Sequence, residues 1–62
     1  MKLIKLKEVI EMTGLARATI YKHIDNNWFP KQIPLGGRSV AWLESEVLEW
    51  ILERIKDRDT NA

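Results

Sequence analysis

A single glycine, Gly14, separates two short stretches in which apolar residues recur at helical spacing. The first stretch carries one stripe at i, i+3, i+4 and i+7, formed by Leu6, Val9, Ile10 and Thr13. Glycine takes the positive φ of a helix end without steric cost, so this helix should stop there. The second stretch runs from Leu15 to about Asn26, before Pro30, which cannot extend a helix. Two short helices with about three residues between them predict a helix-turn-helix.

After Pro30 the apolar residues lose their helical spacing. Two short β-prone runs, 32–35 and 40–43, flank the four-residue loop Gly36-Gly37-Arg38-Ser39. This pattern predicts a β-hairpin, and Pro34 confines its strand to an edge because proline lacks the N–H of a ladder bond. The alternating residues 2–5 predict a third short strand ahead of the first helix.

Helical spacing returns from about Glu44 to Lys56, with acidic residues at the positive N-terminal end. On a helical wheel the apolar positions of this segment span about 200°, whereas one core face needs a stripe of roughly 100°. Leu48 and Leu52 lie on the edge of this wide apolar arc. The apolar residues beyond one core face either pack on a second side of a small core or bind a partner. The whole pattern predicts an α+β fold, a small winged helix-turn-helix over residues 1–56, followed by a polar C-terminal tail at 57–62 that we expect to fray.

The composition narrows the functions that this chain can have. Its 62 residues include no cysteine and one histidine, His23, so we expect no disulfide, no metal site and no cofactor. No serine or acid is evidently arranged to pair with His23, which we expect to pack at the edge of the core; the chain is therefore not predicted to be an enzyme. We expect the three tryptophans (Trp28, Trp42 and Trp50) to build the core rather than to stack on single strands.

No apolar run approaches the roughly 18 residues of a membrane span, and acidic residues occur early, where a signal peptide would stay apolar. We therefore expect a soluble, cytoplasmic protein without a membrane partner. The net charge of +1 hides an asymmetry: residues 1–40 hold seven basic and three acidic side chains, and residues 41–62 hold three basic and six acidic ones. This division favours one face that meets an anion and another that is turned away from it.

The second helix has an outer face suited to DNA. On a helical wheel Ala16, Ile20 and Ile24 face the core, and the opposite face carries Ala18, Thr19, Lys22 and Asp25, with Arg17 and Tyr21 on one flank. Recognition helices place their N-terminal residues against base edges. Arginine pairs bidentately with guanine, threonine bonds or touches a thymine methyl, and a small alanine permits close approach. We therefore assign Arg17, Ala18 and Thr19 to bases, and Tyr21 and Lys22 to phosphates.

The hairpin tip is the second candidate for DNA contact. Glycines at 36 and 37 are also explained by turn chemistry alone. Beside a helix-turn-helix, however, Gly37, Arg38 and Ser39 form the tip of a wing, from which Arg38 reaches an adjacent groove or a phosphate. The loop is not a nucleotide-binding loop, because no lysine followed by serine or threonine opens a helix after it.

Three runs of the sequence, LKEVIEMTGLARATIYKHI, WFPKQIPLGGRSVAW and SEVLEWILERI, together resemble the AlpA family of prophage regulators and excisionase-like proteins, within the MerR-like winged-helix group. The likeness covers residues 3–56, and its most specific pieces are TGL followed by ATIYK, FP, LGGRSVAW and EVLEWI. It implies a DNA-binding winged helix of phages and integrated elements. The family usually has serine where Ala16 stands, and the loss of such a helix cap typically costs ~1 kcal/mol. Ala18 stands where serine or arginine is common.

We therefore predict sequence-specific binding of double-stranded DNA by a phage or mobile-element transcriptional regulator. The recognition helix at about 16–26 would enter the major groove, and the wing at 36–39 would touch the backbone or the minor groove. Two alternatives stay open: an excisionase that assembles on integrase sites, and a protein-interaction module that uses the C-terminal helix. The partners considered besides DNA are further copies of the chain on DNA, an integrase and RNA polymerase.

Overall fold

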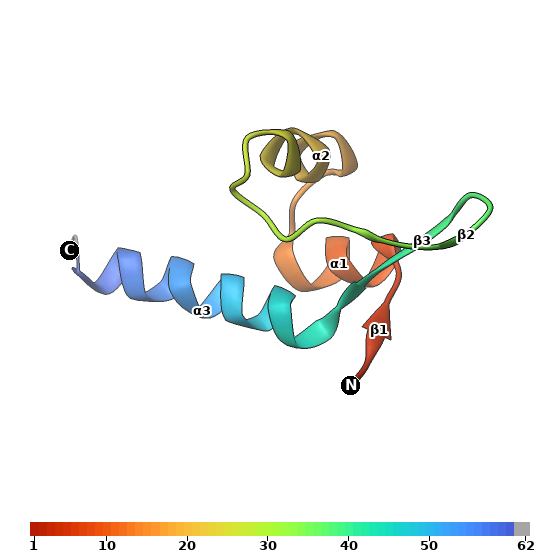
Figure 1. The fold of residues 1–62 in the computed structure, drawn as a ribbon. Helices are drawn as coiled ribbons and strands as arrows, with labels where there is room; N and C mark the ends of the chain where they lie inside the picture. The colour runs from red at the N-terminus through yellow and green to blue at the C-terminus, as the bar shows by residue number, and fades with distance from the viewer. Residues whose placement is uncertain (61–62) are drawn as a thin grey trace.

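A computed structural model describes residues 1–60 of the chain. Its elements in order are β1 (Leu3–Ile4), α1 (Leu6–Thr13), α2 (Arg17–Asp25), β2 (Ile33–Gly36), β3 (Ser39–Leu43) and α3 (Glu44–Thr60). Figure 1 shows α1 and α2 stacked as a helix-turn-helix, the β2–β3 hairpin projecting from the body, and α3 leaving in the other direction. The predicted winged helix-turn-helix is confirmed.

The turn between α1 and α2 is built by two adjacent residues. Gly14 takes the left-handed conformation with φ 72°, and its N–H donates to the carbonyl oxygen of Ile10 at 2.8 Å. The hydroxyl of Thr13 donates to the carbonyl of Val9 at 2.8 Å and accepts the N–H of Leu15 at 3.2 Å. The carbonyls of Val9 and Ile10, in the last turns of α1, thus accept hydrogen bonds at the helix end. The turn predicted at Gly14 is confirmed.

The three strands form one antiparallel sheet in the order β1-β3-β2. Ile4 pairs with Trp42, and Pro34 pairs with Val40. The strand of Pro34, β2, lies at the edge of the sheet, as the sequence predicted. An irregularity in the β2 register lies between Pro34 and Gly36. Gly36 and Gly37 both have positive φ, at 111° and 56°, which closes the hairpin tightly at its tip.

The core lies where the sheet meets the three helices. Its fully buried side chains come from every layer: Ile4, Val9, Ile20, Trp42 and Val47. Two tryptophans also tie the α2–β2 connection to the rest of the molecule. The indole N–H of Trp42 donates to the carbonyl of Pro30 at 3.0 Å, and that of Trp50 donates to the carbonyl of Trp28 at 2.6 Å. In this way the long connection is held to β3 and to α3.

The structure corrects three expectations about packing and boundaries. α2 begins at Arg17, two residues later than predicted, so Ala16 precedes the helix in extended conformation and is exposed instead of facing the core. Trp28 is 59% exposed because Asn27, at φ 60°, turns the chain so that the next residue, Phe29, enters the core instead. Trp42 is buried and Trp50 half-buried, as expected for core residues.

The third correction concerns the C-terminus. α3 continues through Thr60 rather than ending near Lys56, since extending an existing helix costs far less than starting one. The ion pair Arg58–Asp59, at 2.9 Å, lies in this added stretch, and the ion pair Arg54–Asp57, also at 2.9 Å, joins it to the preceding turn. The final two residues of the tail predicted at 57–62 lie outside the described residues. Within residues 1–60, no helix has the length and apolar character needed to cross a membrane.

Candidate nucleic-acid interface

α2 has one buried face and one exposed face, as the sequence predicted. Ile20 and Ile24 are buried in the core. Arg17, Ala18 and Lys22 are exposed, and Thr19 is half-buried between the two faces. Ala18 and Lys22 are four residues apart and so share one surface of the helix. α2 thus presents a small, a polar and two basic side chains on a helix held to the core by its opposite face.

Tyr21 links the exposed face of α2 to the core. Its ring packs edge-on against Trp42, with the ring centroids 6.4 Å apart. The guanidinium carbon of Arg17 lies 6.0 Å from the centroid of the same ring. Such a cation–π contact is worth about 0.5–1 kcal/mol at an exposed site. Tyr21 therefore both packs in the domain and orients the first side chain of α2, a role that wheel analysis alone did not find.

The first turn of α2 has no side-chain cap. Ala16 stands in the capping position, with φ −72° and ψ 155°, and makes no side-chain hydrogen bond to the helix. Its carbonyl accepts the N–H of Ile20 at 3.0 Å, so the helix is regular from its first turn. The first N–H groups are therefore not used by a capping hydroxyl, and they carry the partial positive charge of a helix N-terminus.

The wing places its predicted residues at the tip of the hairpin. Gly37, Arg38 and Ser39 are all exposed there. The ammonium of Lys5 donates a hydrogen bond to the hydroxyl of Ser39, although the two residues are 34 positions apart. Lys5 thus adds a basic group beside the wing. This contact was not predictable from the sequence, because it depends on the pairing of β1 with β3, which is not a local feature.

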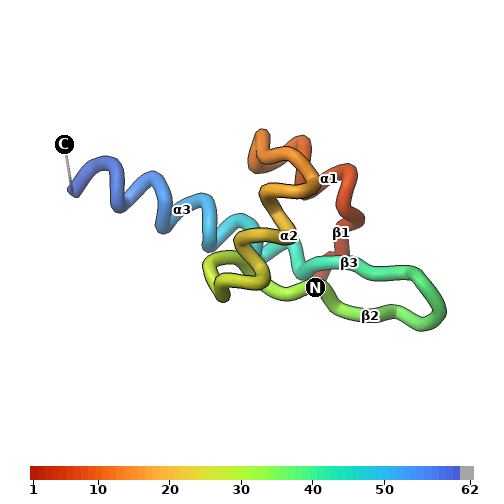
Figure 2. The backbone as a smooth tube through the Cα atoms, turned by 90° about the horizontal axis from the view of Figure 1, so that it is seen from above, coloured from red at the N-terminus to blue at the C-terminus, as the bar shows by residue number. Residues whose placement is uncertain are grey.

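Basic side chains are exposed on α2 and the wing, and acidic side chains begin α3. Figures 1 and 2 show the wing and the C-terminal end of α3 at opposite ends of the structure. α3 carries acidic residues in its first turn, Glu44 and Glu46, whereas the exposed residues Arg17, Lys22 and Arg38 belong to α2 and the wing. No cluster of ligating side chains that could hold a metal ion is found among residues 1–60.

A helix-turn-helix with an exposed basic second helix and a projecting hairpin defines the class of small winged helix-turn-helix proteins. Comparison of the sequence with protein families narrows this class. The model of the family described as prophage CP4-57 regulatory protein (AlpA) matches residues 2–55, and the chain belongs to that family.

Two curated relatives are similar over most of the chain. An uncharacterised protein of enterobacteria phage P4, ORF88, is 46% identical over 57 residues, which are 92% of this chain and 65% of that protein. The chain thus spans about two thirds of the length of the phage relative. The DNA-binding transcriptional activator AlpA of Escherichia coli K12 is 41% identical over 61 residues, which are 89% of this chain and 87% of that protein.

Proposed function

We propose that this protein binds duplex DNA in a sequence-specific manner and regulates transcription from a prophage or another mobile element. The observation that carries the proposal is the division of α2 into a buried face, Ile20 and Ile24, and an exposed face with Arg17, Ala18 and Lys22. A helix anchored in this way enters a major groove as a rigid body. The printed name of the Escherichia coli relative, a DNA-binding transcriptional activator, supports the same function.

In the proposed complex the N-terminal part of α2 reads bases. Arg17 donates to a guanine edge, and its contact with Tyr21 reduces the conformational freedom that it would lose on binding. Thr19 contacts a neighbouring base, and Ala18 lets the helix backbone approach closely. Lys22 and the hydroxyl of Tyr21 bind phosphates, which set the register without reading sequence.

The wing extends the contact beyond one groove. Arg38 binds the phosphate backbone or the minor groove, and Gly37 and Ser39 allow the backbone of the tip to approach DNA. Lys5, held beside Ser39, adds a further basic group near the same strand of DNA. The acidic first turn of α3 directly follows β3, and its first acid, Glu44, forms an ion pair with Lys2 at 3.5 Å, which limits its repulsion of phosphates.

A binding assay with a matched charge control tests the proposal. Duplexes selected by the protein from a random pool are titrated with the wild-type chain and with the double variant Arg17→Ala/Lys22→Ala. We expect the double variant to lose affinity by about 10-fold or more, since it lacks a base contact and a phosphate contact. The control Lys56→Ala/Arg58→Ala removes the same charge from exposed positions of α3 and should bind a single site almost normally.

Two results would contradict the proposal. The first is failure of the wild-type chain to retard any duplex at low salt. The second is an equal loss of affinity in both double variants, because binding would then depend on net charge and not on the face of α2.

A further inference from the structure

α3 carries an exposed apolar stripe that the core does not use. Leu48, Leu52 and Ile55 are 46%, 63% and 41% exposed. They stand at i, i+4 and i+7, so they form one line along the helix. Only Val47 of this helix is fully buried, with Trp50 and Ile51 half-buried beside it. The wide apolar arc predicted from the sequence is therefore filled by the core on one side only.

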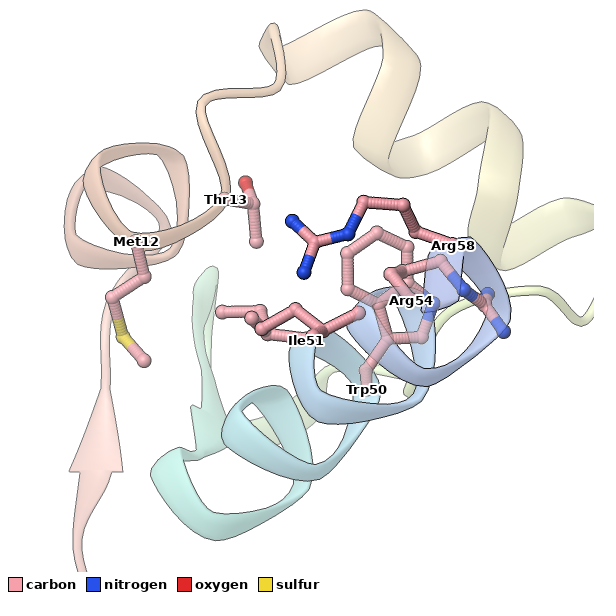
Figure 3. Close-up of a pocket in the computed structure, with 7 residues that line it drawn as sticks. Met12, Thr13, Trp50, Ile51, Arg54 and Arg58 are labelled. Carbon is pink, nitrogen blue, oxygen red and sulfur yellow. The ribbon is translucent and has the colours of Figure 1, made fainter. Parts of the chain in front are cut away.

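This stripe is continuous with an open groove between α1 and α3. The groove has a volume of about 320 Å³ and is lined by Met12, Thr13, Trp50, Ile51, Arg54, Ile55 and Arg58. Figure 3 shows Met12 and Thr13, from the end of α1, on one side and the residues of α3 on the other. Ile55 belongs both to the groove and to the stripe. Together they form one apolar surface, to which we refer as the α3 surface.

Charges along the edge of the stripe identify the occupant. Glu49 and Lys56 lie on the same edge of the stripe, three residues before and four residues after Leu52. Both are exposed, and neither forms an ion pair within the described part of the chain. The first part of α3, residues 44–53, carries four acidic side chains and no basic one, whereas residues 54–60 carry three basic and two acidic ones. The two halves of the helix thus differ in charge, so an antiparallel copy sets the acidic half of each helix against the more basic half of the other.

We propose that the α3 surface binds the α3 surface of a second copy of this chain, with the two helices antiparallel, when both copies are bound to neighbouring DNA sites. In this arrangement Glu49 of each copy lies opposite Lys56 of the other, and Leu52 lies near the centre. A parallel pair would instead set the acidic first halves of both helices side by side. The inference rests on the proposed DNA binding and adds a partner to it.

The size of the stripe explains why DNA is needed. From Leu48 to Ile55 it is about 11 Å long at 1.5 Å per residue, and stable interfaces bury roughly 1,200–2,000 Å² in total. Three side chains and the groove mouth fall well short of that area, so the chain should be monomeric at micromolar concentration. Two copies on one duplex have a much higher effective concentration, at which a weak contact is formed.

The geometry also selects the arrangement of the DNA sites. An antiparallel pair of identical helices has two-fold symmetry, and two-fold protein symmetry matches inverted half-sites. We expect cooperative binding to inverted half-sites at one favoured spacing, with an increase of about 10-fold in affinity for the second copy. Direct repeats of the same half-site should be bound without cooperativity.

A charge-swap experiment tests this pairing. Glu49→Lys sets two lysines against each other, and Lys56→Glu sets two glutamates against each other, so each single variant should bind the second half-site about 10-fold more weakly. The double variant Glu49→Lys/Lys56→Glu restores opposite charges and should restore cooperativity. Asp57→Lys is the matched control: it makes the same change of charge at an exposed position on the side of α3 away from the stripe and should leave cooperativity unchanged.

A cross-link gives a second, independent measurement. The chain contains no cysteine, so Leu52→Cys introduces a single thiol near the proposed centre. Because a disulfide requires Cα atoms within about 7 Å, oxidation should join two copies on the inverted duplex and not in free solution. Glu53→Cys should not be joined under the same conditions.

The outcomes separate the inference from the proposed function. Normal single-site affinity, with cooperativity lost in both single variants and restored in the double variant, supports the α3 pair. Normal single-site affinity without cooperativity at any spacing, or cooperativity that none of the three charge variants changes, overturns it while leaving DNA binding intact. Absence of single-site binding by the wild-type chain overturns the proposed function itself.

Discussion

Ala16 caps the N-terminus of α2, the helix to which we assign DNA recognition, and Arg17 is its first residue. Ala16 has the backbone geometry of a helix cap but no side-chain group to donate or accept. Arg17 follows it and lies over the ring of Tyr21. The first turn of α2 is therefore secured by packing through Tyr21 and Ile20, and not by a capping hydroxyl.

Ala16→Ser should stabilise the domain by about 1 kcal/mol, because the backbone already has the conformation in which a serine hydroxyl accepts an N–H of the first turn. Urea unfolding followed by tryptophan fluorescence measures the effect. The control Ala18→Ser, at an exposed position within the helix, should cost about 0.5 kcal/mol or less. Destabilisation by serine at position 16 would mean that the start of α2 is not set as described.

Arg17→Ala should weaken binding to a selected site by ~1–3 kcal/mol and relax the base preference at one position, since we assign Arg17 to a base edge. Lys22→Ala should weaken selected and random duplexes to the same degree, because a phosphate contact carries no sequence information. Competition titrations with both kinds of duplex separate the two. If both substitutions reduced both affinities equally, Arg17 would not be a base reader.

At this scale the sequence predicted which side chains of α2 face inward and outward, apart from Ala16, which is exposed, and Thr19, which was assigned to the outer face and is half-buried. Ile20 and Ile24 follow the helical period and are buried. Ala16 does not follow it, because the period applies only after the helix has begun. The exposure of Trp28 was not predictable either, since it depends on the positive φ of Asn27, a residue whose conformation the spacing of apolar residues does not report. The DNA-binding roles of the individual residues stay predictions.

The hairpin is the element whose form and proposed function are most closely connected. Its positive-φ glycines allow a tight tip, and the tip carries Arg38 into solvent. Lys5 adds another basic group beside Ser39. The edge position of β2, with Pro34 in it, leaves the tip free of neighbouring strands.

Arg38→Ala should weaken binding to all duplexes and reduce the magnitude of the salt slope by about 1, as expected for the loss of one phosphate contact. The fold should not change, because the side chain is exposed. Lys56→Ala, an equal loss of charge on α3, is the control and should leave single-site affinity and slope unchanged. An identical effect of both substitutions would argue against a wing that touches DNA.

The elements were predicted more accurately than their ends. Gly14, the glycines of the hairpin and the return of helical spacing are local signals, and the structure has the turn, the hairpin and the last helix at those places. The end of α3 at Thr60 was missed, because the residues after Lys56 are polar and carry no periodic signal. Polar residues are compatible with a helix that is already nucleated by packed residues such as Val47 and Ile51.

At the scale of the whole molecule, the two signs of charge are unevenly distributed along the chain. The basic excess of residues 1–40 and the acidic excess of residues 41–62 could be counted from the sequence. The structure shows how these segments are arranged in space. α3 runs away from the wing, and the ion pair of Lys2 with Glu44, at 3.5 Å, lies where α3 begins. The contact between Lys5 and Ser39 could not be predicted from the sequence, since it depends on how β1 pairs with β3.

The dependence of affinity on salt tests the central claim most directly, because phosphate contacts release counterions when they form. Log K for a single selected site should fall linearly with log salt, with a slope of about −0.9 for each phosphate contact. We expect about three to six contacts from one protomer, given the basic residues on α2, the wing and the N-terminal strand, and hence a slope between about −3 and −5. A slope near zero would contradict the account, because an interface built on Arg17, Lys22 and Arg38 cannot bind DNA without that dependence.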